Sequence, residues 1–173
     1  GDAAMTLLVA LAAAAGAGVV SSDGQGEMRF RKAVFYVITV AAAPMLNLSR
    51  VTLCCVDCVN HDLALAAIGQ CVQKCAFGRV LFVTDRAFDI EGIDVVRIPP
   101  LTSRDAYSHY VVKELGAHID TDFVLMVQWD GFVINPAAWR EAFLDYDYVG
   151  ARWGWPEDGH AVGNGGFSLR RLT

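Results

Sequence analysis

Short, uninterrupted apolar runs recur from residue 50 onward, and amphipathic stretches separate them. Such runs suit strands that are buried on both faces, as in parallel sheets. A run such as Val51–Val56 is rich in residues that favour strands. Strands are therefore predicted at 51–56, 79–84, 94–98, 122–127, 146–150 and toward the end of 162–170.

Three helices are predicted between these strands. The first covers 61–76, where apolar residues follow helical spacing, and Phe77–Gly78 ends it. The second opens at a capping box formed by Thr102 and Asp105. The third covers 136–144, because an Asn-Pro pair is typical of a helix start.

Alternating strands and helices predict an α/β fold with a mostly parallel central sheet flanked by helices. Ligands of such folds bind beyond the carboxyl ends of the strands. The candidate site residues are therefore those that follow each strand. They are Asp57, Asn60, Asp85, Gln128, Trp129, Asp130 and the region 153–166.

The first 49 residues differ from the domain predicted at 50–173. Residues 6–20 are almost purely apolar but shorter than the roughly 20 residues that cross a bilayer. Residues 28–43 have a basic start, an apolar centre and an A-x-A end, the outline of a secretory signal. Two interpretations stay open: residues 6–43 associate with a membrane or direct export, or this segment has no functional role.

Charge and cysteine content limit the partners and the compartment that can be expected for this protein. The net charge is −5 and no basic run is present, which argues against a nucleic-acid partner. The five cysteines lack histidines at zinc-finger spacing, and four of them, Cys54, Cys55, Cys71 and Cys75, fall at apolar positions. Free buried cysteines are typical of a reducing compartment, which favours the cytoplasm and disfavours export.

The apolar run 124–127 leads directly into Gln128-Trp129-Asp130-Gly131. A carboxylate at a strand end can hold a hard divalent cation. An acidic domain needs such a cation to bind a diphosphate, since both are negative. A turn or cap role for Asp130 is the alternative.

A glycine-rich segment, Val162-Gly163-Asn164-Gly165-Gly166, precedes the last strand. Its glycines permit close backbone approach to a ligand, whereas Asn-Gly also favours an ordinary hairpin turn. Trp153 and Trp155 lie in the preceding Gly/Pro-containing loop, where they either stack on a sugar or base or anchor the loop.

Three segments together resemble a known group of sequences. The strings VLMVQWDGFVINPAAW, YDYVGARW and VGNGGFSLRR, in this order, resemble an uncharacterised glycosyltransferase-like domain family with a GT-A type fold. The resemblance covers roughly residues 51–171. It implies transfer of a sugar from a nucleotide-sugar donor to a hydroxyl acceptor on a glycan, protein or lipid, with Mn²⁺ or Mg²⁺ as the metal.

The resemblance also implies roles for individual residues. Asp130 matches the metal-binding and catalytic aspartate, and Gln128 replaces the first aspartate of Asp-x-Asp, which weakens the expected metal affinity. Asp57, Asn60 and Asp85 fall where the nucleoside is held. The remaining expected contacts, to sugar and acceptor, are Trp129, Trp153, Asn164, Gly165 and Gly166.

GT-A domains continue beyond the glycine-rich strand, so the domain is expected to be incomplete at its C-terminus. Asp158 is then the candidate catalytic base. The alternative function is a truncated, non-catalytic nucleotide-binding module. A different α/β enzyme is a third possibility, but an aspartyl phosphatase is disfavoured because Asp57-Cys58-Val59-Asn60 lacks the second aspartate of the Asp-x-Asp-x-Thr/Val motif.

Overall fold

A single mixed sheet organises the computed structural model, which describes residues 45–151, 162–163 and 165–172. Six strands form this sheet in the described residues. They are β1 (Leu46–Val56), β2 (Cys75–Thr84), β3 (Asp94–Arg97), β4 (Phe123–Val127), β5 (Tyr148–Gly150) and β6 (Ser168–Arg171). Their spatial order is β3-β2-β1-β4-β6-β5.

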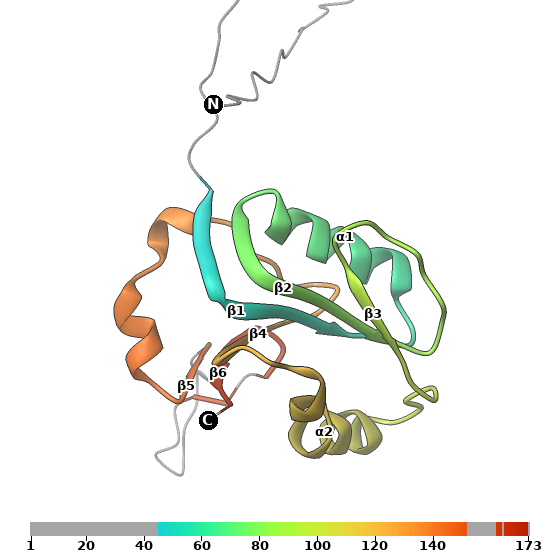
Figure 1. Cartoon of the computed structure of the whole chain (residues 1–173). Coiled ribbons are helices and arrows are strands. Elements are labelled where there is room, and N and C mark those ends of the chain that lie inside the picture. Colours follow the sequence, from blue (N-terminus) through green and yellow to red (C-terminus); the bar gives the residue numbers. More distant parts are fainter. Residues whose placement is uncertain (1–44, 152–161, 164, 173) are drawn as a thin grey trace, which may run out of the picture. The chain divides into compact units, whose positions relative to one another are not determined.

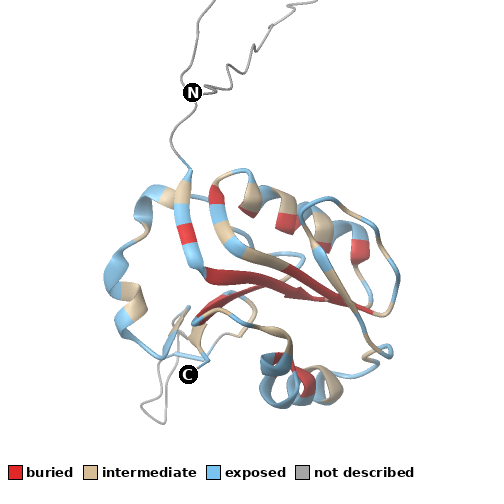
Figure 2. Ribbon diagram, in the orientation of Figure 1, coloured by how far each residue is buried: buried red, intermediate tan, exposed pale blue. Residues whose placement is uncertain are grey.

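Strands β1 to β4 are parallel to one another, whereas β6 runs antiparallel to both β4 and β5. The predicted α/β class with a mostly parallel sheet is therefore confirmed. β1 and β4, at the centre, are buried along most of their length (Figure 2). Burial on both faces explains why their sequences are continuous apolar runs.

Two α-helices cover opposite faces of the sheet (Figure 1). Helix α1 (His61–Val72) packs through Ile68 against one face, and α2 (Arg104–Lys113) packs through Val111 against the other. Three short 3₁₀ helices complete the set: η1 (Leu115–His118), η2 (Pro136–Ala138) and η3 (Glu141–Asp145).

Side chains of β1 alternate between these two layers. Leu53 and Cys55 face the α1 side, while Cys54 and Val56 face the α2 side. Because side chains alternate along the strand, the adjacent residues Cys54 and Cys55 belong to two separate cores. All five cysteines are free. These cysteines act as small apolar residues.

Strand β1 begins at Leu46, five residues before the predicted start at Val51. Its first residues pair with the start of β2, where Leu46 lies beside Cys75. This pairing makes the predicted helix 61–76 wrong at its end: α1 stops at Val72. Phe77–Gly78, predicted to end the helix, lies inside β2.

The predicted cap of α2 is one residue out. Ser103, and not Thr102, is the N-cap, because its hydroxyl oxygen accepts a hydrogen bond from the backbone N–H of Ala106 at 3.1 Å. The predicted cap at Asn135 is confirmed, with its side-chain oxygen 3.1 Å from the N–H of Ala137.

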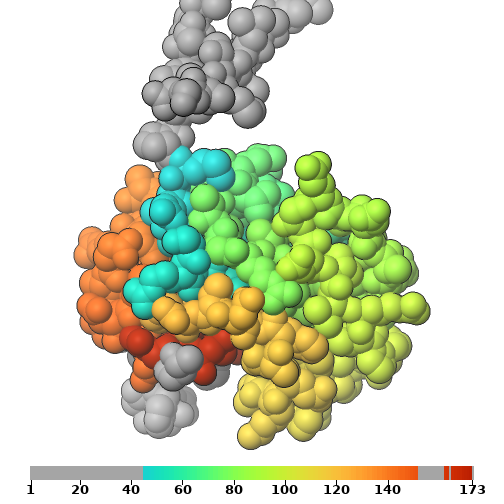
Figure 3. Space-filling view, in the orientation of Figure 1, coloured from blue at the N-terminus to red at the C-terminus, as the bar shows by residue number. Residues whose placement is uncertain are grey.

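The helix predicted over 136–144 is wrong. Trp139 has extended dihedral angles (φ −61°, ψ 141°), and these separate η2 from η3. The rings of Trp139 and Phe143 pack edge to face, with their centroids 5.5 Å apart. In space-filling view, residues around 130–150 cover one flank of the domain, and the β2–β3 connection covers the other (Figure 3).

No helix in the described part of the chain is long and apolar enough to span a bilayer. The predicted membrane-associated or signal-like segment, residues 6–43, lies outside the described residues.

Candidate functional site

The chain changes direction across the sheet at β1 and β4. From β1 it proceeds through α1 to β2 and β3 on one side, and it returns through α2 to β4 on the other side of β1. Such a topological switch point opens a crevice at the carboxyl ends of the two central strands, where α/β folds bind ligands. The residues after β1 and β4 are therefore the candidate site.

A groove of about 240 Å³ lies at this switch point. Three segments form its walls: the β1–α1 loop, the start of α2 with the residue Leu101, and the end of β4. The lining residues are Asp57, Cys58, Val59, Asn60, Leu101, Ser103, Arg104, Tyr107, Gln128 and Trp129. Four residues predicted from the sequence thus lie together: Asp57, Asn60, Gln128 and Trp129.

Asp57 organises the β1–α1 loop. Its Oδ1 accepts hydrogen bonds from the backbone N–H groups of Val59 at 2.7 Å and Asn60 at 2.5 Å. Asn60 precedes α1 as its N-cap residue, but its side chain makes no capping bond. The Asn60 carboxamide is therefore a polar group of the groove wall that the helix does not use.

Gln128 and Tyr107 connect opposite walls of the groove. The amide nitrogen of Gln128 donates to the Tyr107 hydroxyl at 3.1 Å. Burial raises the pKa of Tyr107, so this phenol stays protonated at neutral pH. The bond fixes the orientation of the Gln128 carboxamide in the groove.

The N-terminal end of α2 contributes positive charge. Ser103 caps the helix, and Arg104, its first residue, lines the groove with an exposed side chain. A helix N-terminus and a guanidinium both favour a bound anion. By contrast, Lys113 lies in the last turn of α2, at the end away from the groove.

Asp130 lies in a tight turn directly after β4. The N–H of Gly131 donates to the carbonyl of Gln128 at 3.0 Å, which closes this turn. The Asp130 side chain is exposed and does not line the groove. Among the described residues no group of three or more His, Cys, Asp or Glu side chains could hold a metal.

The glycine-rich segment adjoins this turn. A Cβ at Gly131 would lie 3.7 Å from the Phe167 side chain and 3.9 Å from the Gly166 carbonyl. Arg170 fixes the segment by donating to the Gly165 carbonyl at 3.2 Å and to the Ser168 hydroxyl at 3.1 Å. Gly165 and Gly166 are thus close to the Asp130 turn but outside the groove.

Asp85 follows β2 at the same edge of the sheet and is bound to a buried histidine. His61 Nε2 lies 2.8 Å from Asp85 Oδ1, and His61 is only 5% exposed. The hydrogen bond from His61 is the main reason that the pKa of Asp85 is lower than its ordinary value. Asp85 does not line the groove.

Three predicted site residues, Trp153, Asp158 and Asn164, lie outside the described residues. The sequence analysis missed His61, Ser103, Arg104 and Tyr107 as site residues. A signal for the last three was available, because a helix that follows a parallel strand begins at the carboxyl edge of the sheet. No local signal marked His61 as the partner of Asp85.

Three core cysteines, Cys54, Cys55 and Cys71, are not suited to metal binding or nucleophilic chemistry. Burial raises the pKa of Cys54 to about 12 and raises those of Cys55 and Cys71 as well. The thiolate is the reactive and metal-binding form. These three thiols are therefore structural.

Comparison with known proteins adds one finding. No curated protein and no solved structure matches the chain. Residues 92–173, which contain α2, β4 and the glycine-rich segment, match a family described as "Protein of unknown function (DUF5672)".

Proposed function

We propose that the chain is a glycosyltransferase domain of GT-A type, which transfers a sugar from a nucleotide-sugar donor to a hydroxyl acceptor. One observation carries the proposal. The three segments of the resemblance, which follow one another in the sequence, contribute three adjacent strands: β5 pairs with β6, β6 pairs with β4, and a Cβ on Gly131 would lie 3.7 Å from Phe167. They meet at the carboxyl edge, where α/β folds bind ligands.

The groove at the switch point is the proposed nucleoside and diphosphate site. The carboxamides of Asn60 and Gln128 supply neutral hydrogen-bonding groups for base and ribose. Arg104 and the α2 N-terminus supply positive charge for the diphosphate. Trp129, which is 44% exposed at the rim, offers an aromatic face.

A divalent metal fits this site only in part. Asp130 is an exposed carboxylate, and Gln128 adds no charge beside it. Mg²⁺ is commonly held by one or two carboxylates together with substrate phosphates and water. The donor set therefore suits a metal that arrives with the diphosphate, with Asp130 as its protein ligand. When bound, such an ion would neutralise the charge of the departing diphosphate.

The acceptor and the donor sugar are proposed to lie near the glycine-rich segment. Gly166 adjoins the Asp130 turn, since a Cβ on Gly131 would lie 3.9 Å from its carbonyl oxygen, and Arg170 fixes the backbone at Gly165. A base that deprotonates the acceptor hydroxyl is required if the sugar configuration is inverted. Asp158 remains the proposed base from the sequence.

The test is turnover of nucleotide sugars by the full chain, followed by the release of nucleoside diphosphate. We expect release with one donor, supported by Mn²⁺ and lowered at least tenfold in Asp130→Asn, because a charged metal ligand is lost. The matched control is Asp145→Asn, an exposed carboxylate in η3 away from the site.

A chain that binds a nucleotide but never releases a product from any donor would support the alternative, a non-catalytic nucleotide-binding module. Equal turnover in Asp130→Asn and wild type would contradict the role of Asp130.

A further inference from the structure

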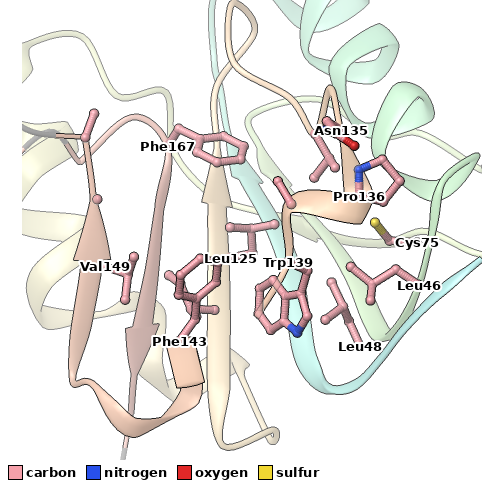
Figure 4. Close-up of a pocket in the computed structure, with 15 residues that line it drawn as sticks. Leu46, Leu48, Cys75, Leu125, Asn135, Pro136, Trp139, Phe143, Val149 and Phe167 are labelled. Carbon is pink, nitrogen blue, oxygen red and sulfur yellow. The ribbon is translucent and has the colours of Figure 1, made fainter. Parts of the chain in front are cut away.

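A second cavity, of about 380 Å³, lies on the α1 side of the sheet. Its floor is formed by Leu125 of β4, Val149 of β5 and Leu169 of β6, and the segment 133–143 forms its wall (Figure 4). The other lining residues are Leu46, Leu48, Cys75, Gly150, Ala151 and Phe167. The volume is within the range of small-ligand pockets, roughly 300–1,000 Å³.

The lining of the cavity favours an uncharged, apolar ligand. No Asp, Glu, Lys, Arg or His lines the cavity within the described residues. The polar atoms nearby are already used: Asn135 Oδ1 accepts from Ala137, and the indole N–H of Trp139 donates to Glu141 at 3.2 Å. A ligand here would be held by burial of carbon and by the aromatic rings of Trp139, Phe143 and Phe167.

The cavity reaches the proposed transfer site. Phe167 lines the cavity, and its side chain would lie 3.7 Å from a Cβ placed on Gly131, the residue after Asp130. Gly150 and Ala151, at the carboxyl end of β5, line the same end of the cavity. A molecule bound in the cavity could thus extend a polar group toward the glycine-rich segment.

We propose that this cavity binds the apolar part, an alkyl or aryl group, of an amphipathic acceptor whose hydroxyl group receives the sugar. The proposal rests on the proposed function for its role, but binding of an apolar group can be measured without turnover. It narrows the acceptor from any hydroxyl compound to one with an apolar group of limited size.

The test uses a series of butyl, hexyl and octyl glycosides below their micelle-forming concentrations. Each buried methylene should tighten binding about fourfold, so octyl should bind roughly fifteenfold tighter than hexyl. Methyl resonances of Leu48, Leu125 and Val149 should shift on binding, because these side chains line the cavity.

Filling the cavity provides the matched comparison. Ala138 lines the cavity, so Ala138→Trp should fill it. Ala142 lies in η3 outside the lining, so Ala142→Trp is the control. We expect Ala138→Trp to abolish the dependence of affinity on chain length and Ala142→Trp to keep it. Val149→Phe serves as a second filling variant if Ala138→Trp does not fold.

Three results would overturn the proposal. The first is an affinity of the wild type that does not change with alkyl chain length, and the second is a wild-type dependence on chain length that persists in Ala138→Trp and in Val149→Phe. The third is a stable dimer that buries this face and binds no glycoside. Nucleotide-dependent stabilisation lost in Asp130→Asn, together with a flat alkyl series, would reject the cavity proposal and leave the proposed function intact. A chain-length dependence without nucleotide binding would reject the proposed function and, with it, the acceptor role of the cavity.

Discussion

The hydroxyl group of Tyr107 on α2 lies 3.1 Å from the side-chain amide nitrogen of Gln128 at the end of β4. Both residues line the groove at the switch point, so the bond joins two of its walls. Gln128 thus has a specific hydrogen-bonding partner in the opposite wall. A carboxylate could only accept a hydrogen bond from this phenol, whereas the carboxamide donates to it.

Removing the Tyr107 hydroxyl should weaken nucleotide binding without unfolding the protein. One hydrogen bond contributes about 0.5–1.5 kcal/mol, so Tyr107→Phe should lower nucleotide affinity roughly two- to tenfold through loss of Gln128 orientation. Calorimetric titration with the bound nucleotide measures this. Unchanged affinity in a folded variant would show that the orientation of Gln128 has no role.

Placing an aspartate at position 128 should strengthen metal binding at the proposed site. Gln128→Asp places a second carboxylate two residues before Asp130, and affinity for hard cations rises with the charge of their ligands. We expect about tenfold tighter Mn²⁺ binding in the presence of nucleotide, since charge-assisted contacts contribute about 1.5–3 kcal/mol. Gln128→Asn is the control. Equal Mn²⁺ affinity in the two variants would contradict a metal site at this turn.

The pair His61 and Asp85 predicts an acid dependence of stability. The hydrogen bond from His61 Nε2, helped by the charge of Arg86, holds the pKa of Asp85 below its ordinary 3.8. The ionised Asp85 therefore stabilises the folded state fully above that ordinary value, and this contribution disappears as the pH falls through the lower folded pKa.

The excess stability of wild type over Asp85→Asn should accordingly be constant near neutral pH and shrink below about pH 4. Carboxyl NMR titration of Asp85 gives the direct measurement, and in His61→Phe its pKa should return toward 3.8. A pKa that His61→Phe leaves unchanged would exclude the hydrogen bond as its cause.

The central strands β1, β2 and β4 were predicted because each contains a short apolar run, which burial of both faces requires. The start of β2 was missed because Cys75–Phe77 continue the apolar spacing of α1, and pairing with Leu46–Leu48 decides their conformation. Likewise, an Asn-Pro cap begins η2 correctly, but packing of Trp139 interrupts the helix. Such interactions are tertiary, and no local pattern contains them.

The site was partly predictable because the central strands were predicted and the site residues follow them. Asp57, Asn60, Gln128 and Trp129 follow the two central strands, and topology brings strand ends together. Tyr107 reaches the groove from α2, and although its apolar spacing suggests a core residue, the start of α2 at the carboxyl edge indicates a place in the site.

Gly78 offers a test of the β1–β2 pairing. A Cβ at this position would overlap the carbonyl oxygen of Ser49, at the irregularity of β1 between Leu48 and Thr52. Gly78→Ala should therefore cost about 1–3 kcal/mol of unfolding free energy, as overpacking does.

The matched control is Gly69→Ala in α1, where a Cβ meets nothing within 4 Å. It should stabilise the protein by about 0.5–1 kcal/mol, the helix preference of alanine over glycine. Chemical denaturation measures both variants. Equal effects at the two positions would contradict the close approach of β1 and β2.

The central claim is a nucleotide site at the switch point, and thermal unfolding of the full chain with nucleoside diphosphates and nucleotide sugars tests it most directly. A ligand at about 100 times its dissociation constant stabilises the folded state by about 2.7 kcal/mol. We predict stabilisation by one nucleotide that requires Mn²⁺ and is lost in Asp130→Asn. A folded protein that no nucleotide stabilises, with or without Mn²⁺, would contradict the account.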